Sequence, residues 1–382
     1  MTFRYEDPDH ADLAASAAAF TRSEIVPHLE QWEQDGEIPR ELHRKAAAAG
    51  LMGVGFPDAV GGQGGDLLDT IVVSEAMLTA GASTGLLAGL FTHGIAVPHI
   101  IESGNTELID RFVRPTLAGE LIGCLGVTEP GGGSDVANLR TTAARDGDHY
   151  IVNGGKTFIT SGVRADFITA AVRTGGPGHD GISLLVIEKD TPGVTVDRRL
   201  DKHGWRCSDT AELGFSDARV PVANLVGPEN TGFYQIAGQF VIERIALAVY
   251  GYATAARCLE LTVEHCRARE TFGRPLIANQ VVQHRLVEMR RRIETARAYT
   301  REVARRHLAG QDQIAQVCLA KETACEAATF VTDACVQLHG GTGYMHGTEV
   351  ERHYRDARIL PIGGGATEVL TDLAAKLLGY AS

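Results

Sequence analysis

The sequence lacks the cysteine patterns that identify metal-binding and disulfide-stabilised proteins. No Cys-x-x-Cys pair occurs, and the number of cysteines, 7, is odd. They are scattered, mostly in apolar helical segments: Cys124, Cys207, Cys258, Cys266, Cys318, Cys325 and Cys335. Such cysteines are typical of small core residues in a reducing compartment. We therefore expect no disulfide framework and no metal site.

Basic clusters and a targeting segment are also missing. The 36 Lys and Arg residues are outnumbered by 48 Asp and Glu, which excludes a nucleic-acid surface formed by bulk charge. The N-terminus, MTFRYEDPDHADLAAS, is acidic where a leader would be basic, so we expect a cytoplasmic protein. The uncharged stretch 76–101 contains His93, Pro98 and His99, so we expect a buried helix or helix pair and no membrane insertion.

Three regions of different periodicity divide the 382 residues, which suffice for two or three domains. Residues 1–120 and 229–382 repeat apolar side chains at three- and four-residue spacing, which predicts helices. Residues 121–228 hold short β-branched runs separated by Gly, Pro and Asp, which predict strands. The runs are LIGCLGV, HYIVNG, TFITSG, FITAAV, ISLLVIE, VTVDRRL and AELGF. The expected fold is mainly α with a central β domain and without internal repeats.

A glycine-rich segment, LGVTEPGGGSD at 125–135, follows the first predicted strand. Its backbone N–H groups and hydroxyls could cradle a phosphate or a flat polar ring, although a hairpin without ligand fits this fragment equally well. The segment lacks the GxGxxG spacing, and strands follow it where a dinucleotide fold needs a strand-helix-strand unit. A nicotinamide-binding Rossmann domain is therefore disfavoured.

Glu243 and Arg244 are the only charged residues between positions 230 and 256 in an otherwise apolar helical pattern. At helical spacing Glu243 shares a face with Phe240, Ala246, Leu247 and Tyr250. Apolar surroundings raise the proton affinity of a carboxylate, which suits a general base near neutral pH. The alternative is a buried Glu held by an Arg of another helix, with no role in chemistry.

Six motifs, in order and over nearly the whole chain, resemble the acyl-CoA dehydrogenase family. They are TEPGGGSD (128–135), NGGKTFITSG (153–162), ARETFGRP (268–275), NQ (279–280), QLHGGTGY (337–344) and RDARILPIGGGATEV (355–369). The segments GLMGVGFPDAVGGQGGD and DKHGWRCSDTAELGFSDARVP are also similar to that family. Six motifs in register are far more specific than any one of them.

This resemblance implies an N-terminal helical domain, a middle β-barrel-like domain and a C-terminal four-helix bundle, assembled as a homotetramer. It also implies FAD, held between the β domain and the bundle across a subunit boundary. The residues implied on the flavin side are Leu125, Val127, Thr128, Gly133, Ser134, Phe158, Ile159 and Thr160. Those implied on the adenine side, from a neighbouring subunit, are Arg269, Thr271, Phe272, Gln280, Gln337, Leu338, Gly340 and Gly341.

One departure from the family pattern bears on the catalytic base. Many members carry the base in a Tyr-Glu-Gly-Thr segment, and the matching residues here are Gly363 to Ala366. A subset resembling the isovaleryl and long-chain enzymes places the carboxylate directly before an Arg, as in Glu243-Arg244. Ala366 replaces a Thr of the family, and Thr367 and Glu368 are expected to compensate near the cofactor. The implied substrate-binding residues are Ser134, Tyr234, Val241, Arg244, Gly364 and Gly365.

The reaction implied by the resemblance is α,β-dehydrogenation of a saturated acyl-CoA thioester in fatty acid metabolism. The Gly364 N–H would polarise the thioester carbonyl, Glu243 would remove the α-proton, and the β-hydride would pass to flavin N5. The product would be a trans-2-enoyl thioester, and an electron-transfer flavoprotein would reoxidise the flavin. Two alternatives stay open: the same chemistry on an acyl or aminoacyl group of a carrier protein, and a non-catalytic flavoprotein. Acyl chain length and branching also stay open.

Overall fold

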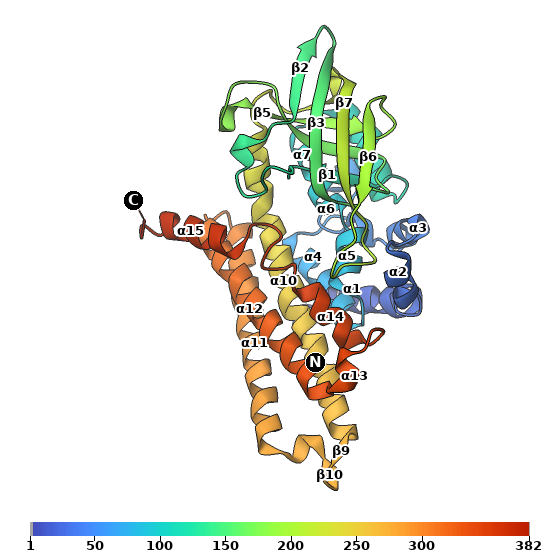
Figure 1. The fold of residues 1–382 in the computed structure, drawn as a ribbon, viewed down its shortest axis with the longest axis vertical. Coiled ribbons are helices and arrows are strands. Elements are labelled where there is room, and N and C mark those ends of the chain that lie inside the picture. Colours follow the sequence, from blue (N-terminus) through green and yellow to red (C-terminus); the bar gives the residue numbers. More distant parts are fainter. Residues whose placement is uncertain (1–2, 382) are drawn as a thin grey trace.

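The computed structural model describes residues 3–381 and consists of two helical regions and a β-sheet region arranged around one long helix. That helix, α10 (Gly232–Ala268), runs from the sheet at the top of Figure 1 to the opposite end of the molecule. In Figure 1 the N-terminal helices lie on one side of α10, and the helical segments 280–308 and 367–377 lie on the other. The order helical, β, helical is the one predicted from periodicity.

The N-terminal region is built from short helices. They are α1 (Pro8–Phe20), α2 (Leu29–Asp35), α3 (Arg40–Ala48), α4 (Leu67–Thr79), α5 (Thr84–Leu90), α6 (His93–Ala96), α7 (Pro98–Glu102), α8 (Thr106–Leu108) and α9 (Arg114–Leu117), with π-helical turns at Thr21–Ile25 and Ile109–Val113. Asp66 caps α4 and forms a capping box with Asp69, which satisfies N–H groups that the first helical turn leaves free. The cap fixes where α4 begins, and α4 later forms one wall of the site.

The uncharged stretch 76–101 is divided into more helices than the one or two that the sequence predicts. It contains the end of α4 followed by α5, α6 and α7, because caps and turns at Ser83, Thr92 and Pro98 interrupt the helical pattern. Most of its residues are buried, as expected. Among residues 3–381 no single helix has the length and composition to cross a membrane, whereas Thr84–Leu90 and His93–Glu102 together pass that test with a bend of 56°.

The middle region is a strongly curved sheet. Its strands are β1 (Gly123–Gly126), β2 (Thr142–Asp146), β3 (His149–Thr160), β4 (Phe167–Arg173), β5 (Ile182–Glu188), β6 (Val194–Arg199), β7 (Thr210–Pro221) and β8 (Leu225–Val226). The strand order is β6-β7-β3-β2-β4-β5-β8, with β1 pairing in parallel with β4. The described strands β6 and β8 do not pair with each other, so the sheet wraps around its apolar core without closing into a complete barrel.

Two strand predictions differ from the structure in an instructive way. HYIVNG and TFITSG form one strand, β3, whose pairing with β7 is interrupted by two register shifts. The second shift surrounds Phe158, which has a φ of 60° and a side chain that is 69% exposed. Strand β2 was missed because only Ala143 of its five residues is buried, so no apolar run marks it.

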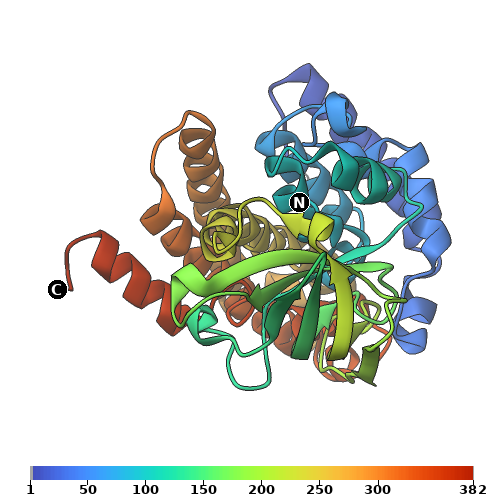
Figure 2. The same ribbon diagram turned by 90° about the horizontal axis from the view of Figure 1, so that it is seen from above.

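The C-terminal region consists of α10, α11 (Gln280–Leu308), α12 (Ile314–His339), α13 (Gly341–Tyr344), α14 (Glu349–Ala357) and α15 (Thr367–Leu377). The helices α10, α11 and α12 are long and pack against one another, and α15, with only 11 residues, packs on α12. A short hairpin of two-residue strands, β9 (Glu270–Thr271) and β10 (Arg274–Pro275), connects α10 to α11. In Figures 1 and 2, α15 projects from the body of the molecule, away from the N-terminal helices.

One apolar core joins the N-terminal helices to α10, α11 and α12 and contains five of the cysteines. All seven cysteines are buried and free, as predicted for core residues. A second core lies between α6, α7, α9 and the strands β4 and β5. Because α10 contributes to both cores, its middle part is held between the N-terminal helices and the bundle, where the candidate site lies.

Candidate active site

A largely apolar cavity of about 540 Å³ lies between α10 and the N-terminal helices α4, α5, α6 and α7. Residues of α10 at helical spacing form one wall: Gln239, Ile242, Glu243, Ala246, Leu247, Val249 and Tyr250. Opposite them lie apolar groups such as Ile71 and Phe91, and Trp205 and Thr160 come from the β region. The volume falls in the range of small-molecule pockets, so a ligand of substantial size fits here.

Glu243 is placed as the sequence predicts, on the cavity wall. Ala246, Leu247 and Tyr250 share its face and line the cavity, whereas Phe240 lies under the Arg244 guanidinium, whose central carbon is 5.5 Å from the ring centroid. Glu243 retains some exposure because it faces the cavity, yet dense packing around it removes bulk water.

The electrostatics around Glu243 suit a proton acceptor. Loss of hydration is the largest effect and raises the pKa of the Glu243 carboxyl, while the charges of Arg244 and Lys321 lower it in part. No hydrogen bond or ion pair joins Glu243 to another of the residues 3–381. The carboxylate is therefore neither neutralised by a partner nor freely hydrated, as a general base requires.

The Gly363–Gly365 segment lies directly against this carboxylate. A Cβ atom built on Gly364 would lie 3.5 Å from Glu243 Oε1 and only 2.5 Å from Leu247 Cδ1. Gly364 and Gly365 have φ values of 63° and 106°, a conformation that residues with a side chain rarely adopt. The absence of a side chain at Gly364 leaves space beside the Glu243 carboxylate, which approaches from α10.

Gly364→Ala is expected to slow flavin reduction because the new methyl group would press on Leu247 and displace the Glu243 carboxylate. A positive φ also disfavours Ala, so we expect a loss of about 1–2 kcal/mol in unfolding free energy. Thermal unfolding and the rate of flavin reduction by substrate check both effects. Gly310→Ala is the matched control, because Gly310 has a φ of 75° but no heavy atom within 4 Å of its built Cβ. Equal rates in the two variants would contradict this steric account.

The two segments predicted on the flavin side lie side by side. Thr157 N–H donates to Thr128 O at 2.9 Å, so the glycine-rich loop runs along the end of β3. Thr160 lines the cavity that contains Glu243, and Phe158 presents an uncovered ring. Gly133 and Ser134 are exposed, whereas the side chains of Leu125, Val127 and Ile159 pack toward the protein core. This arrangement fits a flat ring system lying across the mouth of the cavity, contacted through backbone and hydroxyl groups.

A buried ion pair anchors the glycine-rich loop. Lys156 Nζ donates to Glu129 Oε1 at 2.7 Å and to Val127 O at 3.1 Å. The Glu129 carboxylate also accepts the N–H groups of Arg140 and Thr141 at 2.6 and 2.9 Å. Burial lowers the pKa of Lys156 to about 8, against the opposing effect of Glu129. With both ends of the pair hydrogen-bonded, the loop has one defined path past β3.

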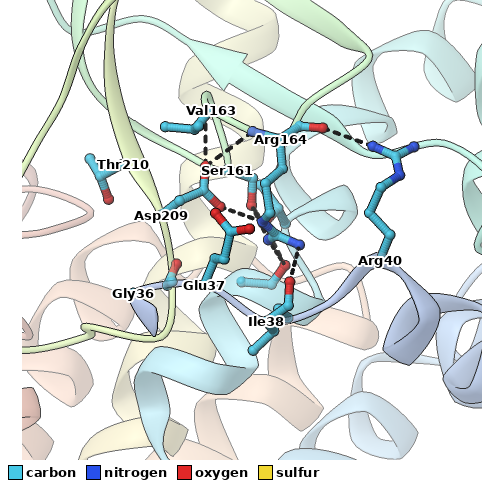
Figure 3. A network of polar contacts seen from close by, with 12 residues as sticks. Gly36, Glu37, Ile38, Arg40, Ser161, Val163, Arg164, Asp209 and Thr210 are labelled. Carbon is cyan, nitrogen blue, oxygen red and sulfur yellow. Dashed lines mark hydrogen bonds and ion pairs between the residues drawn. The ribbon is translucent and has the colours of Figure 1, made fainter. Parts of the chain in front are cut away.

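The turn after Thr160 is held by a second buried network (Figure 3). Arg164 Nε donates to Asp209 Oδ1 at 2.5 Å, and the side chains of this pair are 6% and 0% exposed. The other Asp209 oxygen accepts the N–H groups of Val163 and Arg164 at 2.8 and 3.2 Å. Arg164 also donates to Ile38 O, while Ser161, at a φ of 62°, shares a hydrogen bond of 2.7 Å with Thr92 on the cavity wall. The network ties the Thr160 turn to the N-terminal helices.

The residues predicted on the adenine side gather at the other end of α10. The His265 ring stacks on the His339 ring with centroids 4.2 Å apart, so the end of α10 adjoins the end of α12 and the glycines that follow it. Six residues of the group are exposed: Arg269, Phe272, Gln280, Gln337, Gly340 and Gly341; Thr271 and Leu338 are half-buried. Glu243 and Arg269 are 26 residues apart along α10, or about 39 Å at the helical rise. One chain therefore does not bring the two groups of residues together on one cofactor molecule.

The remaining predicted residues have mixed positions. The ring of Tyr234 is exposed, its hydroxyl donates to Asp180 at 3.0 Å, and it does not line the cavity. Val241 is buried in the core and also does not line the cavity. Thr367, at the first turn of α15, bonds back to Pro361 O, and Glu368 beside it is exposed.

Lys321 and the pair Arg164–Asp209 were missed from the sequence. Lys321 lies beside Glu322 in the segment CLAKETACEAATF on α12, which also contains Glu326, so the sequence does not single it out as it does Glu243. No local pattern marks Arg164 and Asp209, because their partners are distant in sequence.

Comparisons with known proteins identify the family of this chain. Three family models match successive parts of the chain: the N-terminal domain of acyl-CoA dehydrogenase at residues 7–120, the middle domain at 124–218 and the C-terminal domain at 230–379. The chain is 37% identical to the mitochondrial long-chain specific acyl-CoA dehydrogenase of Rattus norvegicus, over 96% of this chain and 86% of the relative. It is 35% identical to the mitochondrial isobutyryl-CoA dehydrogenase of Dictyostelium discoideum, over 97% and 89%.

Solved structures give the same assignment. A probable acyl-CoA dehydrogenase of Mycobacterium abscessus is 58% identical and superposes with a TM-score of 0.98, over 98% of this chain and 100% of that chain. A glutaryl-CoA dehydrogenase of Mycobacterium smegmatis in complex with FADH2 is 26% identical, with a TM-score of 0.92 over 98% and 96%. The chain belongs to the acyl-CoA dehydrogenase family, and it is an FAD-dependent oxidoreductase.

Proposed function

We propose that the protein oxidises the α,β bond of a saturated acyl-CoA to the trans-2-enoyl thioester, with Glu243 as the base that removes the α-proton. The observation that carries this proposal is the Glu243 carboxylate, which has no hydrogen-bond or ion-pair partner among residues 3–381. It lies beside Gly364 on the wall of an apolar cavity that Thr160 also lines. Desolvation raises its pKa, so it accepts a carbon-bound proton better than a hydrated carboxylate does.

Backbone donors beside Glu243 support the position of the thioester carbonyl. The N–H groups of Gly364, Gly365 and Ala366 bond to no other group among residues 3–381, whereas the carbonyls of Gly364 and Gly365 are occupied. A carbonyl oxygen bound by such N–H groups would take up negative charge as the α-proton leaves, which makes that proton more acidic. The donor and the base would then act on adjacent atoms of the substrate.

The bound FAD supplies the two-electron acceptor for the β-carbon. Thr128, Phe158 and Thr160 would hold the flavin ring beside the cavity that Thr160 and Glu243 line. The apolar wall excludes water, which strengthens each hydrogen bond to the thioester carbonyl. We further propose that an electron-transfer flavoprotein reoxidises the enzyme and that the protein acts in the cytoplasm.

The cavity favours a medium or long straight acyl chain. It continues beyond Glu243 along α10 as far as Tyr250 and reaches His307 and Leu308 at the end of α11. The stretch from Gln239 to Tyr250 alone spans about 16 Å at the helical rise. A short branched acyl group would leave most of this apolar surface unfilled and would gain little from its burial.

Anaerobic titration of the purified holoenzyme tests the proposal. Butyryl-CoA, isobutyryl-CoA, octanoyl-CoA and palmitoyl-CoA are added separately, and loss of the oxidised flavin absorbance is measured. We expect octanoyl- or palmitoyl-CoA to bleach the flavin at the lowest concentrations. Bleaching only by acyl groups on a carrier protein would identify the carrier-protein alternative, and no bleaching by any thioester would identify a non-catalytic flavoprotein.

We propose a homotetramer in which each FAD is shared between two subunits. The separation of the two cofactor groups along α10 supports this arrangement, as do the exposed Phe272 and the exposed apolar residues Val281 and Val287 on α11. The projecting helix α15 also ends in exposed apolar groups, Leu377, Leu378 and Tyr380. Such surfaces are typical of subunit contacts in an oligomer.

Phe272→Ala is expected to weaken FAD binding by about tenfold or more, because an aromatic side chain buried by a neighbouring subunit contributes about 1.5–3 kcal/mol. FAD retention after gel filtration and the mass of the complex check this result. Tyr344→Ala is the control, since Tyr344 is an exposed aromatic residue outside the predicted FAD group. An unchanged FAD content in a monomeric Phe272 variant would contradict the shared site.

A further inference from the structure

Two buried cations contact consecutive carbonyls of the Gly363–Gly365 segment. Lys321 Nζ, on α12, donates to Gly365 O at 2.6 Å, and Arg244 Nε, on α10, donates to Gly364 O at 3.1 Å. The Lys321 side chain is 0% exposed. A fully buried ammonium group is costly to keep, so its placement on a main-chain oxygen calls for a specific role.

The segment needs such anchors because it has no side chains of its own. Gly364 and Gly365 both have positive φ, and no side-chain packing limits the many conformations that glycine can adopt. Hydrogen bonds from a charged donor are among the stronger ones in proteins. Two of them on adjacent carbonyls, from two different helices, leave this backbone one orientation.

That orientation matters for the proposed reaction. Because each peptide unit is planar and trans, a carbonyl held toward a cation turns the following N–H group the opposite way. The Gly365 N–H is therefore directed away from Arg244, and the Ala366 N–H away from Lys321. These N–H groups, with that of Gly364, are the ones that find no acceptor among residues 3–381.

We propose that Lys321 is a positioning residue that acts through Gly365, holding the Gly363–Gly365 segment in place against the Glu243 carboxylate. This inference rests on the proposed function and adds a residue to it. Lys321 does not line the cavity and contacts neither substrate nor base directly. Its effect passes through the backbone that it holds and through its charge.

The charge of Lys321 also reaches Glu243. Lys321 and Arg244 are the two charges that lower the pKa of Glu243, against the larger opposing effect of burial. Burial lowers the pKa of Lys321 itself, and the groups that face it are Cys325, Glu322, Arg244 and Glu243, with Glu322 Oε1 at 3.9 Å from Nζ. The other titratable groups around the cavity are Asp66, His93, Glu102, Tyr250 and His307.

The sign of the expected pH effect follows. Glu243 must be ionised to act as a base, so the rate of flavin reduction falls in acid as Glu243 is protonated. Removing the Lys321 charge removes an effect that lowers the pKa of Glu243. The fall in rate should therefore begin at a higher pH than in the wild type.

The experiment compares Lys321→Met with Lys321→Arg in the FAD-containing enzyme, with flavin reduction by a saturating acyl-CoA from the titration panel followed by stopped flow across pH. We expect Lys321→Met to shift the acid limb of the pH–rate profile to higher pH and to lower the limiting rate of flavin reduction about tenfold. The substrate Kd should change less. Lys321→Arg should restore the acid limb because it keeps the charge. Lys321→Gln replaces Met if the Met variant does not fold.

The control is Lys45→Met, which removes an exposed ion pair with Glu24, and neither of these residues lines the cavity. If Lys321 had only a structural role, its substitution would change thermal unfolding and leave the pH–rate profile unchanged. A folded neutral variant with the wild-type acid limb and limiting rate overturns the inference. Failure of the proposed function has a different signature, namely rapid flavin reduction in Glu243→Gln, so the two outcomes are separable.

Discussion

Glu243→Gln is expected to retain acyl-CoA binding and to reduce flavin at least about a hundredfold more slowly than the wild type. The amide has nearly the shape of the carboxylate and still fits beside Gly364, but it does not accept a proton. Because no other described residue bonds to Glu243, the substitution breaks no ion pair, and folding should be unaffected. Stopped-flow reduction and a substrate titration of the flavin spectrum separate the chemical step from binding.

Glu264→Gln is the matched control for this experiment. Glu264 is an exposed residue of the same helix, about six turns after Glu243, and it does not line the cavity. We expect wild-type reduction in this variant. Near-normal flavin reduction in Glu243→Gln would show that another group is the base. Glu102 would then be the next candidate, because it is a carboxylate that lines the same cavity and burial raises its pKa.

Arg164→Met should have the largest effect on stability. It leaves the fully buried Asp209 carboxylate without its cation, which costs about 3 kcal/mol or more even though two backbone N–H groups still donate to Asp209. The turn that follows Thr160 should loosen as well, because Arg164 connects it to Ile38 O on the N-terminal region (Figure 3). Denaturant unfolding should show the lower stability, and purified protein should contain less FAD.

Arg198→Met provides the comparison for an exposed pair. Arg198 Nη2 lies 2.8 Å from Glu212 Oε1, nearly the same separation as in the buried pair, but the side chains are 64% and 28% exposed. Solvent screens such a pair, so the loss of stability should be much smaller than in Arg164→Met. Equal losses in the Arg164 and Arg198 variants would show that burial does not set the difference.

The sequence was informative wherever a residue contradicts its own local pattern. Glu243 stands out in an apolar helix, and the structure places it on the cavity wall with three of the four neighbours expected on its face. Gly363 to Gly365 stand out where the family resemblance leads one to expect a carboxylate, and they lie against Glu243.

Prediction failed where a residue gives no local signal. Strand β2 has one buried residue, so its pairing with β3 and β4 depends on neighbours distant in sequence. The breaks between the helices in the stretch 76–101 depend on caps and turns. The absence of charged residues from this stretch gives no sign of them. Val241, expected near the substrate, turns into the core because its position on α10 faces the bundle and not the cavity.

By itself, the sequence determined the three-part order, the helical and strand periods, and the position of a carboxylate in an otherwise apolar helix, because these depend on spacing along the chain and on composition. Only the tertiary structure decided that α10 meets α4 to α7 around a cavity, that Arg244 and Lys321 donate to a glycine backbone, and that Arg164 meets Asp209. Those contacts join residues 44 to 120 positions apart, and their energies depend on burial, which arises only when the chain has folded.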